Sequence, residues 1–243
     1  MRPDGWIIPG WPAPANVHAL CTTRQGGVSA APYASLNLGD HVGDAPRAVT
    51  QNRALLRRHL PADPLWLNQV HGTTVADAGR LVGTPEADAC VAREANQVCA
   101  VLTADCLPLL LCDRHGTAVA AAHAGWRGLA EGVIEASVDS MRRDPAALLA
   151  WLGPAIGPQA VEVGGEVRER FLAHDGAAAS AFIPHGRDKW LADIFRLARL
   201  RLAECGITQV SGGDFCTFSE AARFFSYRRE GTTGRMASLI WLS

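Results

Sequence analysis

Three short apolar segments follow one another in the middle of the chain, at residues 98–102, 107–112 and 117–122. Each has the length of a β-strand, and apolar residues fill it without the alternation of a strand that exposes one face to water. Continuous apolar strands occur where both faces of a sheet are covered. The segments therefore predict buried strands inside a layered fold.

Helices are predicted at residues 46–60, 129–142 and 190–204, where apolar residues recur at three- and four-residue spacing. Asp44 is the expected N-cap of the first helix. Gly206 is expected to end the third, because glycine readily adopts the left-handed conformation that follows a helix.

Further strands are expected near both ends of the chain. Residues 6–38 are rich in Pro, Gly, Ser and Asn and favour strand and loop, residues 150–152 lead into a Gly-Pro turn, and residues 236–242 form a closing strand. Because strands and helices intermix without a regular βαβ alternation, the sequence predicts an α+β fold with mixed β-sheets in layers. No internal repeat or linker is visible, so residues 1–243 are expected to form a single domain.

Composition and charge exclude several classes of protein. Hydrophobic residues make up 48% of the chain and charged residues 19%, a balance that excludes intrinsic disorder. The formal net charge is −1 without a block of Lys or Arg, which argues against a nucleic-acid partner. No apolar run reaches the roughly 18 residues of a membrane span, and no glycine-rich loop suits a nucleotide cofactor. The seven cysteines follow no disulfide pattern, so we expect free thiols and a cytoplasmic protein. The sequence does not indicate an oligomeric state.

Three polar motifs at predicted strand ends carry residues that can bind a metal ion. They read NQVHG, TADC and HAGWRG, and they contain His71, Cys106 and His123. Two imidazoles and a thiolate, with a fourth position left for water, are typical of catalytic zinc. The spacing alone does not show that the three residues meet. In the absence of a CxxC or HExxH motif, hydrogen-bonded core histidines and a small buried thiol are the alternative interpretation.

The chain also resembles a known bacterial family. It carries the strings TRxGGVSxxPYxSLNLGxHxGD, NQVHG, TADCLPLLL, AAHAGWRG, LGPAIGP and FFSYRRxGxTGRMA. These are similar to motifs of the YfiH-like proteins, long labelled multicopper polyphenol oxidases or laccase-domain proteins. The resemblance spans nearly the whole chain.

The resemblance implies a layered α/β/β/α fold, a zinc site at His71, Cys106 and His123, and purine nucleoside phosphorylase activity. The implied substrates are adenosine, inosine and methylthioadenosine together with phosphate. Adenosine deaminase activity at the same site is implied as well. The family has also been linked to the correction of misincorporated amino acids in peptidoglycan precursors.

Phosphorolysis requires a binding site for phosphate. Arg24 and Arg127 lie in polar loops beside predicted strand ends, and a guanidinium group pairs bidentately with phosphate oxygens. Arg228 and Arg229 are further candidates, for which a surface ion pair is an equal alternative.

Other polar residues are candidates for binding the nucleoside or moving a proton. Asn37 and His41 in the SLNLGxH stretch, and Gln69 beside His71, are candidate substrate-binding residues, although Asn37 is also typical of an ordinary turn. Asp105 is the candidate acid or base for deamination. Its alternative role is to orient a ligand or a backbone turn.

Three rival functions use the same residues. Two histidines and a cysteine also form the equatorial ligand set of a blue-copper site, so copper is the alternative metal. A copper phenol oxidase also needs a second, histidine-rich copper cluster, and the remaining histidines form no H-x-H pair that would provide it. A metal-free protein could use Cys106 as the nucleophile of a cysteine hydrolase or amidase, activated by His123 or His71. A metal-sequestering protein would bind zinc without turnover.

Overall fold

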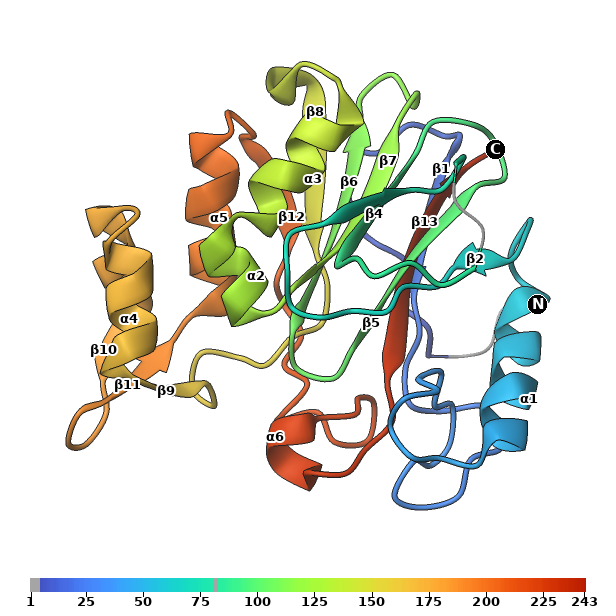
Figure 1. Ribbon diagram of the computed structural model, residues 1–243, viewed down its shortest axis with the longest axis horizontal. Helices are drawn as coiled ribbons and strands as arrows, with labels where there is room; N and C mark the ends of the chain where they lie inside the picture. Colours follow the sequence, from blue (N-terminus) through green and yellow to red (C-terminus); the bar gives the residue numbers. More distant parts are fainter. Residues whose placement is uncertain (1–4, 81–82) are drawn as a thin grey trace.

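The computed structural model describes residues 5–80 and 83–243, which form two large β-sheets, a small third sheet and six α-helices (Figure 1). The helices are α1 (Pro46–Arg57), α2 (Trp126–Glu131), α3 (Val133–Met141), α4 (Gly165–Leu172), α5 (Ile194–Glu204) and α6 (Tyr227–Glu230). The strands are β1 (Val17–Cys21), β2 (Pro64–Leu65), β3 (Val75–Asp77), β4 (Ala89–Ala92), β5 (Val98–Thr103), β6 (Leu107–Asp113), β7 (Val119–Ala124), β8 (Leu148–Leu152), β9 (Glu162–Gly164), β10 (Phe182–Pro184), β11 (Lys189–Ala192), β12 (Gln209–Gly212) and β13 (Met236–Leu242).

Both large sheets mix parallel and antiparallel pairs, as the sequence predicts. The four-stranded sheet has the order β1-β13-β5-β2, in which only the β2–β5 pair is parallel. The six-stranded sheet has the order β12-β8-β6-β7-β4-β3, and its two edge strands run parallel to their neighbours. The chain crosses between the two sheets from β2 to β3, from β4 to β5 and from β5 to β6.

The two sheets pack face to face and helices cover their outer faces, which gives the expected α/β/β/α layers (Figure 1). Val101 of β5 and Leu110 of β6 belong to the core between the sheets. The neighbouring residue Leu102 packs with Leu56 of α1 on one outer face, and Leu109 belongs to the core beneath α3 and α5 on the other. Strands buried on both faces explain why these segments are apolar throughout.

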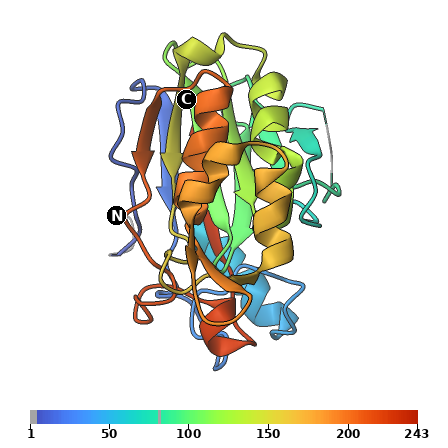
Figure 2. The ribbon, with the colours of Figure 1, turned by 90° about the vertical axis from the view of Figure 1, so that its left-hand side faces the viewer.

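The small sheet projects from the helical side of the molecule. It has the order β10-β11-β9, is antiparallel, and packs with α4. Figure 2 looks onto this side, where α4 and α5 stand in front of the larger sheet. Residues of the small sheet form one wall of the cavity described below.

The predicted strands are confirmed, with small shifts at their ends. The three central segments form β5, β6 and β7, residues 150–152 belong to β8, residues 236–242 form β13, and residues 6–38 contain β1. Within residues 5–80 and 83–243, no helix is both long and apolar enough to cross a membrane.

The predicted helices need three corrections. Residues 129–142 do not form one helix, because Gly132 adopts a φ of 102° and separates α2 from α3. The last long helix begins at Ile194 instead of residue 190, since the preceding residues pair as β11. The N-cap of α1 is Ala45, which offers no side-chain acceptor, and Asp44 lies one residue before it.

Candidate active site

The three predicted metal ligands lie together at one end of the two sheets. His71 lies in the connection from β2 to β3, Cys106 in the connection from β5 to β6, and His123 in β7. Their potential ligand atoms all lie within 4.8 Å of one another. Cys106 Sγ is 3.9 Å from His71 Nε2, and the two imidazole rings are 4.8 Å apart between centroids. The side chain of His123 is buried, whereas His71 is exposed, so the cluster opens to solvent on one side.

Asp88 holds two of these ligands in position. Its carboxylate accepts a hydrogen bond from His123 Nδ1 at 2.8 Å and three more from the backbone N–H groups of Val70, His71 and Gly72. The bond to Nδ1 leaves the Nε2 atom of His123 available to a metal, and carboxylates commonly orient metal-binding histidines in this way. Burial raises the pKa of Asp88, but the bonds from His123 and the backbone outweigh it and keep that pKa below its usual range. Sequence reasoning missed Asp88, because a single aspartate among alanines carries no motif.

The lack of a side chain at Gly125 leaves the space that the side chains of His71 and Cys106 occupy. A Cβ atom at this position would lie 2.8 Å from His71 Cδ2 and 3.2 Å from Cys106 Sγ. The glycine of the HAGWRG motif is therefore required by the close approach of the ligands.

The ligands also change one another's protonation. Burial raises the pKa of the Cys106 thiol, but the charges and hydrogen bonds of His123 and His71 outweigh burial and lower that pKa to about 6. Burial lowers the pKa of His123, but Cys106 and Asp88 outweigh it and raise the pKa to about 9. A thiolate beside an imidazolium is thus favoured at neutral pH, and the thiolate is the form of cysteine that binds metals or acts as a nucleophile.

Asp105 precedes Cys106 with a backbone φ of 97° and a buried side chain. One carboxylate oxygen accepts a hydrogen bond from the Thr217 hydroxyl at 2.6 Å, and the other accepts one from the Arg228 backbone N–H at 2.7 Å. Asp105 therefore joins the metal-ligand loop to α6 and to the segment before it. Of its two predicted roles, these contacts favour the orienting one.

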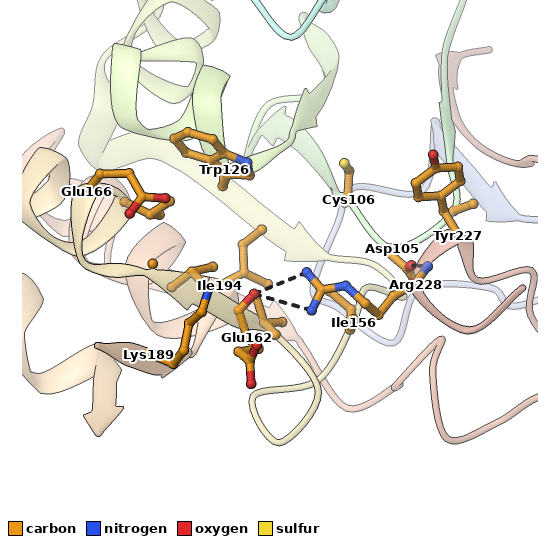
Figure 3. A pocket seen from close by; sticks show the side chains of 15 residues that line it. Asp105, Cys106, Trp126, Ile156, Glu162, Glu166, Lys189, Ile194, Tyr227 and Arg228 are labelled. Atoms are coloured by element: carbon orange, nitrogen blue, oxygen red, sulfur yellow. Dashed lines mark hydrogen bonds between the residues drawn. The ribbon is translucent and has the colours of Figure 1, made fainter. Parts of the chain in front are cut away.

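A cavity of about 410 Å³ lies on one side of Cys106 (Figure 3). Figure 3 shows Trp126 on one wall and Ile156, Glu162 and Arg228 on the opposite wall. The guanidinium of Arg228 donates to the backbone oxygens of Ala160 and Glu162. Further lining residues come from the small sheet and α4, among them Val163, Glu166 and Lys189. Sequence reasoning named Arg228 but missed the contribution of the small sheet and α4 to this cavity.

A second cavity, of about 340 Å³, lies on the other side of the ligands. It is lined by His41, Gln69, Leu102, Thr103 and Arg235 together with all three ligands. The two cavities share Ala104, Cys106 and Tyr227. The predicted substrate-binding residues His41 and Gln69 therefore lie beside the metal cluster. The Gln69 amide is already paired with the backbone N–H and C=O of Leu102.

The structure does not bring Asn37, Arg24 or Arg127 to either cavity. Asn37 is fully buried, and its amide bonds to Gly39 and Asp44, as in a structural turn. Arg24 pairs with Glu230 at 2.6 Å and also donates to backbone oxygens. Arg127 is exposed and packs over its neighbour Trp126.

Known proteins are similar to this chain over nearly its whole length. A family model described as multi-copper polyphenol oxidoreductase laccase matches residues 18–243. The chain is 58% identical over 242 residues to the purine nucleoside phosphorylase PA4543 of Pseudomonas aeruginosa, covering 98% of this chain and 99% of that protein. It is 57% identical over 242 residues to the purine nucleoside phosphorylase YfiH of Escherichia coli, covering 97% and 98%. The chain belongs to this laccase-like YfiH family.

Solved structures of YfiH-family proteins have the same fold. The protein NMB0706 of Neisseria meningitidis superposes with a TM-score of 0.96 at 53% identity, covering 99% of this chain and 100% of that one. A YfiH protein of Bacillus licheniformis superposes with a TM-score of 0.88 at 30% identity, covering 93% of each. In the described part of this YfiH-family chain, the other cluster of potential metal ligands is Glu135, His174 and Glu204 on the helical side. That cluster contains a single histidine.

Proposed function

We propose that the protein is a zinc-dependent purine nucleoside phosphorylase that acts on adenosine, inosine and methylthioadenosine and also deaminates adenosine at the same site. The observation that carries the proposal is the His71, Cys106 and His123 cluster, which opens onto two adjoining cavities. Two cavities suit a reaction with two substrates, a purine nucleoside and phosphate. The names of the P. aeruginosa and E. coli relatives support this substrate pair.

The residues present fit a zinc ion. Two imidazoles and one thiolate are zinc ligands, Asp88 orients His123, and Gly125 leaves the space in which the ligand atoms converge. A zinc ion bound there would supply Lewis-acid chemistry at neutral pH.

The larger cavity fits the nucleoside. Its size lies in the range of about 300–1,000 Å³ found for small-molecule sites. Ile156, Ile194 and the Trp126 ring offer apolar surface to the faces of a purine. Glu166 and Lys189 provide an acceptor and a donor for the polar edge of the base or the ribose hydroxyls.

The chain's own residues orient the substrates and form no covalent bond to them. Asp105 fixes the start of α6, and thereby Tyr227 and Arg228, which border the cavities. The small sheet and α4 cover the nucleoside from the side opposite the sheets and reduce its contact with water.

The proposal also places the protein in the cytoplasm. All seven cysteines are unpaired, which supports a reducing environment and the cytoplasm.

Chromatography of the reaction products tests the proposal. Incubation of the zinc-loaded protein with adenosine and phosphate should give adenine and ribose 1-phosphate, and incubation without phosphate should give inosine. Cys106→Ala and His123→Ala should lose both the metal and the turnover. If both variants keep one zinc per chain, the metal assignment is wrong; if no purine nucleoside is converted by the zinc-loaded protein, the activity is wrong.

A second candidate function is a cysteine hydrolase, because the Cys106 thiolate lies beside the imidazolium of His123. The alternative metal is copper, which the description of the matching family favours. Metal analysis of protein purified without added copper separates zinc from copper. Hydrolase activity that survives complete chelation would favour the metal-free enzyme.

A further inference from the structure

Arg235 lies in the second cavity without a carboxylate partner. Its Nη1 atom donates to the backbone oxygens of Thr233 at 3.0 Å and Gly234 at 3.1 Å. Among residues 5–80 and 83–243, no Asp or Glu lies within ion-pair distance of its guanidinium. Burial lowers the pKa of Arg235 and outweighs the charges of Cys106 and Asp105, which raise it, yet a guanidinium stays protonated in proteins. Arg235 is therefore a partly desolvated positive charge that a bound anion would stabilise.

The surroundings hold Arg235 in place. A Cβ atom at Gly39 would lie 2.8 Å from Arg235 Cγ, so this glycine lets the loop pack closely against the arginine stem. The Tyr227 ring centroid is 6.0 Å from the guanidinium carbon. The side chain is thus positioned from two sides by packing, and its backbone bonds fix one nitrogen.

The two cavities differ in charge. Three carboxylates line the larger cavity, namely Asp105, Glu162 and Glu166, against two cations, Lys189 and Arg228. No carboxylate is among the described residues that line the second cavity, to which Arg235 and His41 both contribute. Asp40, which is not part of that lining, lies 3.6 Å from His41 Nδ1. The balance of charge therefore favours an anionic substrate in the second cavity over the first.

The other candidate arginines are already engaged. Arg24 and Arg229 share the Glu230 carboxylate, and Arg228 donates to backbone oxygens in the cavity that contains the carboxylates. Arg127 is exposed outside both cavities. Arg235 remains as the arginine whose charge faces a cavity beside the metal cluster.

We propose that Arg235, with His41 beside it, binds the inorganic phosphate that attacks the nucleoside. This inference rests on the proposed phosphorylase function and assigns the second cavity to phosphate and the larger one to the nucleoside. Because the cavities meet at Cys106 and Tyr227, a phosphate oxygen in one faces the ribose in the other. That oxygen forms the bond to C1′ as the C1′–N bond breaks. The bonding electrons leave with the purine, which takes up the proton of hydrogen phosphate.

Steady-state kinetics of Arg235→Gln test the assignment. The KM for phosphate should rise by about ten- to a hundred-fold, the effect of losing a hydrogen bond to a charged group, while the KM for adenosine changes far less. Arg187→Gln is the matched control, because it removes the same charge from a side chain that is 97% exposed. It should leave both constants unchanged.

Arg235→Lys covers the case in which the glutamine variant does not fold. It keeps the charge but loses the planar fork, so the KM for phosphate should rise by a smaller factor than in Arg235→Gln. An unchanged KM for phosphate in the folded Arg235 variants would overturn the inference and leave the phosphorylase function standing.

Calorimetric titration with inorganic phosphate, without a nucleoside, separates the two hypotheses. The zinc-loaded protein should bind phosphate, and Arg235→Gln should bind it at least about ten times more weakly. If the protein binds phosphate through Arg235 but converts no nucleoside, the anion site stands and the phosphorylase function fails. If Arg235→Gln binds phosphate as the unaltered protein does, the anion site is wrong.

Discussion

Asp88 and Gly125 donate no ligand atom, but they determine how the three residues of the candidate metal site are placed. Asp88 fixes the ring of His123 and, through three backbone N–H groups, the loop that carries His71. Gly125 keeps a side chain out of the space between the ligands. We expect both residues to affect metal binding through the position of the proposed ligands.

Gly125→Ala should weaken zinc binding by about 10–100-fold without unfolding the protein, as disturbed ligand positioning does in other metal sites. The backbone φ of −62° at Gly125 suits alanine, so the cost arises from the contacts of the new Cβ with His71 and Cys106. Zinc titration of the variant measures the effect. Gly165→Ala is the matched control, because a Cβ there meets no atom within 4 Å. Equal zinc affinity in both variants would contradict this account.

The reactivity of Cys106 should depend on pH and on the metal. A thiol with a pKa of about 6 is mostly ionised at pH 7, whereas an ordinary thiol with a pKa near 9 is not. In chelator-treated protein, the rate of Cys106 alkylation by iodoacetamide should therefore rise through pH 6 and level off near neutrality. Zinc should abolish the reaction. Peptide mass spectrometry distinguishes Cys106 from Cys216, whose pKa is also lowered. A midpoint near pH 9 would show that the neighbouring histidines do not stabilise the thiolate.

At the scale of single elements, α6 and the small sheet bring residues to the site that lie far from the ligands in sequence. The four residues of α6 begin after Ser226, whose side chain accepts a hydrogen bond from the Arg229 N–H. Asp105 accepts the N–H of Arg228 in the same turn. The position of Tyr227 between the cavities therefore depends on a carboxylate 122 residues earlier in the chain, next to a metal ligand.

Asp105→Asn should impair substrate binding more than chemistry. An amide can accept only one of the two hydrogen bonds from Thr217 and Arg228, so α6 should shift and the KM for adenosine should rise. With excess zinc present, the kcat for deamination should stay within about ten-fold, because a proton shuttle would cost roughly 10²–10⁴-fold. Thr217→Val removes one of the same bonds and should change the KM in the same direction. A large loss of kcat in Asp105→Asn alone would restore the proton-shuttle role.

The elements predicted from sequence are those with a strong local signal. The central strands and β13 are continuous apolar segments, and their burial on both faces follows from that pattern. The predicted start of α5 was wrong because the helical spacing of apolar residues extends back into the preceding strand, β11. Asp193, whose side chain accepts a hydrogen bond from the Arg196 N–H, marks the true boundary as an N-cap. The strands of the small sheet are three or four residues long and partly exposed, so no periodicity develops in them.

The site was predicted less completely than the fold. The motifs contain His71, Cys106 and His123, which the structure brings together, and His41 and Gln69, which line the cavity beside them. All five lie at the ends of buried strands or in loops beside them. Arg235, for which we propose an anion-binding role, was not predicted, because the lack of an ion-pair partner is visible only in the tertiary structure. Arg24 was chosen for its polar loop, but Glu230, more than 200 residues later, pairs with its charge. Such pairing depends on tertiary structure, which the spacing of residues does not encode.

At the scale of the whole molecule, the metal cluster lies where the chain passes between the two large sheets. His71 belongs to the crossing from β2 to β3, and Cys106 belongs to the crossing from β5 to β6. His123 adds the central strand β7 of the six-stranded sheet. A metal ion bound to all three residues would therefore join two crossings between the sheets to one strand of the six-stranded sheet.

Zinc should accordingly stabilise the whole fold. A ligand that binds only the folded state adds about 2.7 kcal/mol at a free concentration of ~100 Kd. For chains of ~150–250 residues each kcal/mol raises the Tm by about 2–4 °C, so saturating zinc should raise the Tm of chelator-treated protein by about 5–10 °C. Differential scanning calorimetry at fixed free zinc measures the shift. It should vanish in Cys106→Ala, and it should persist in His174→Ala, which removes the histidine of the other ligand cluster. A shift that instead depends on His174 would place the stabilising ion on the helical side, away from the sheet crossings.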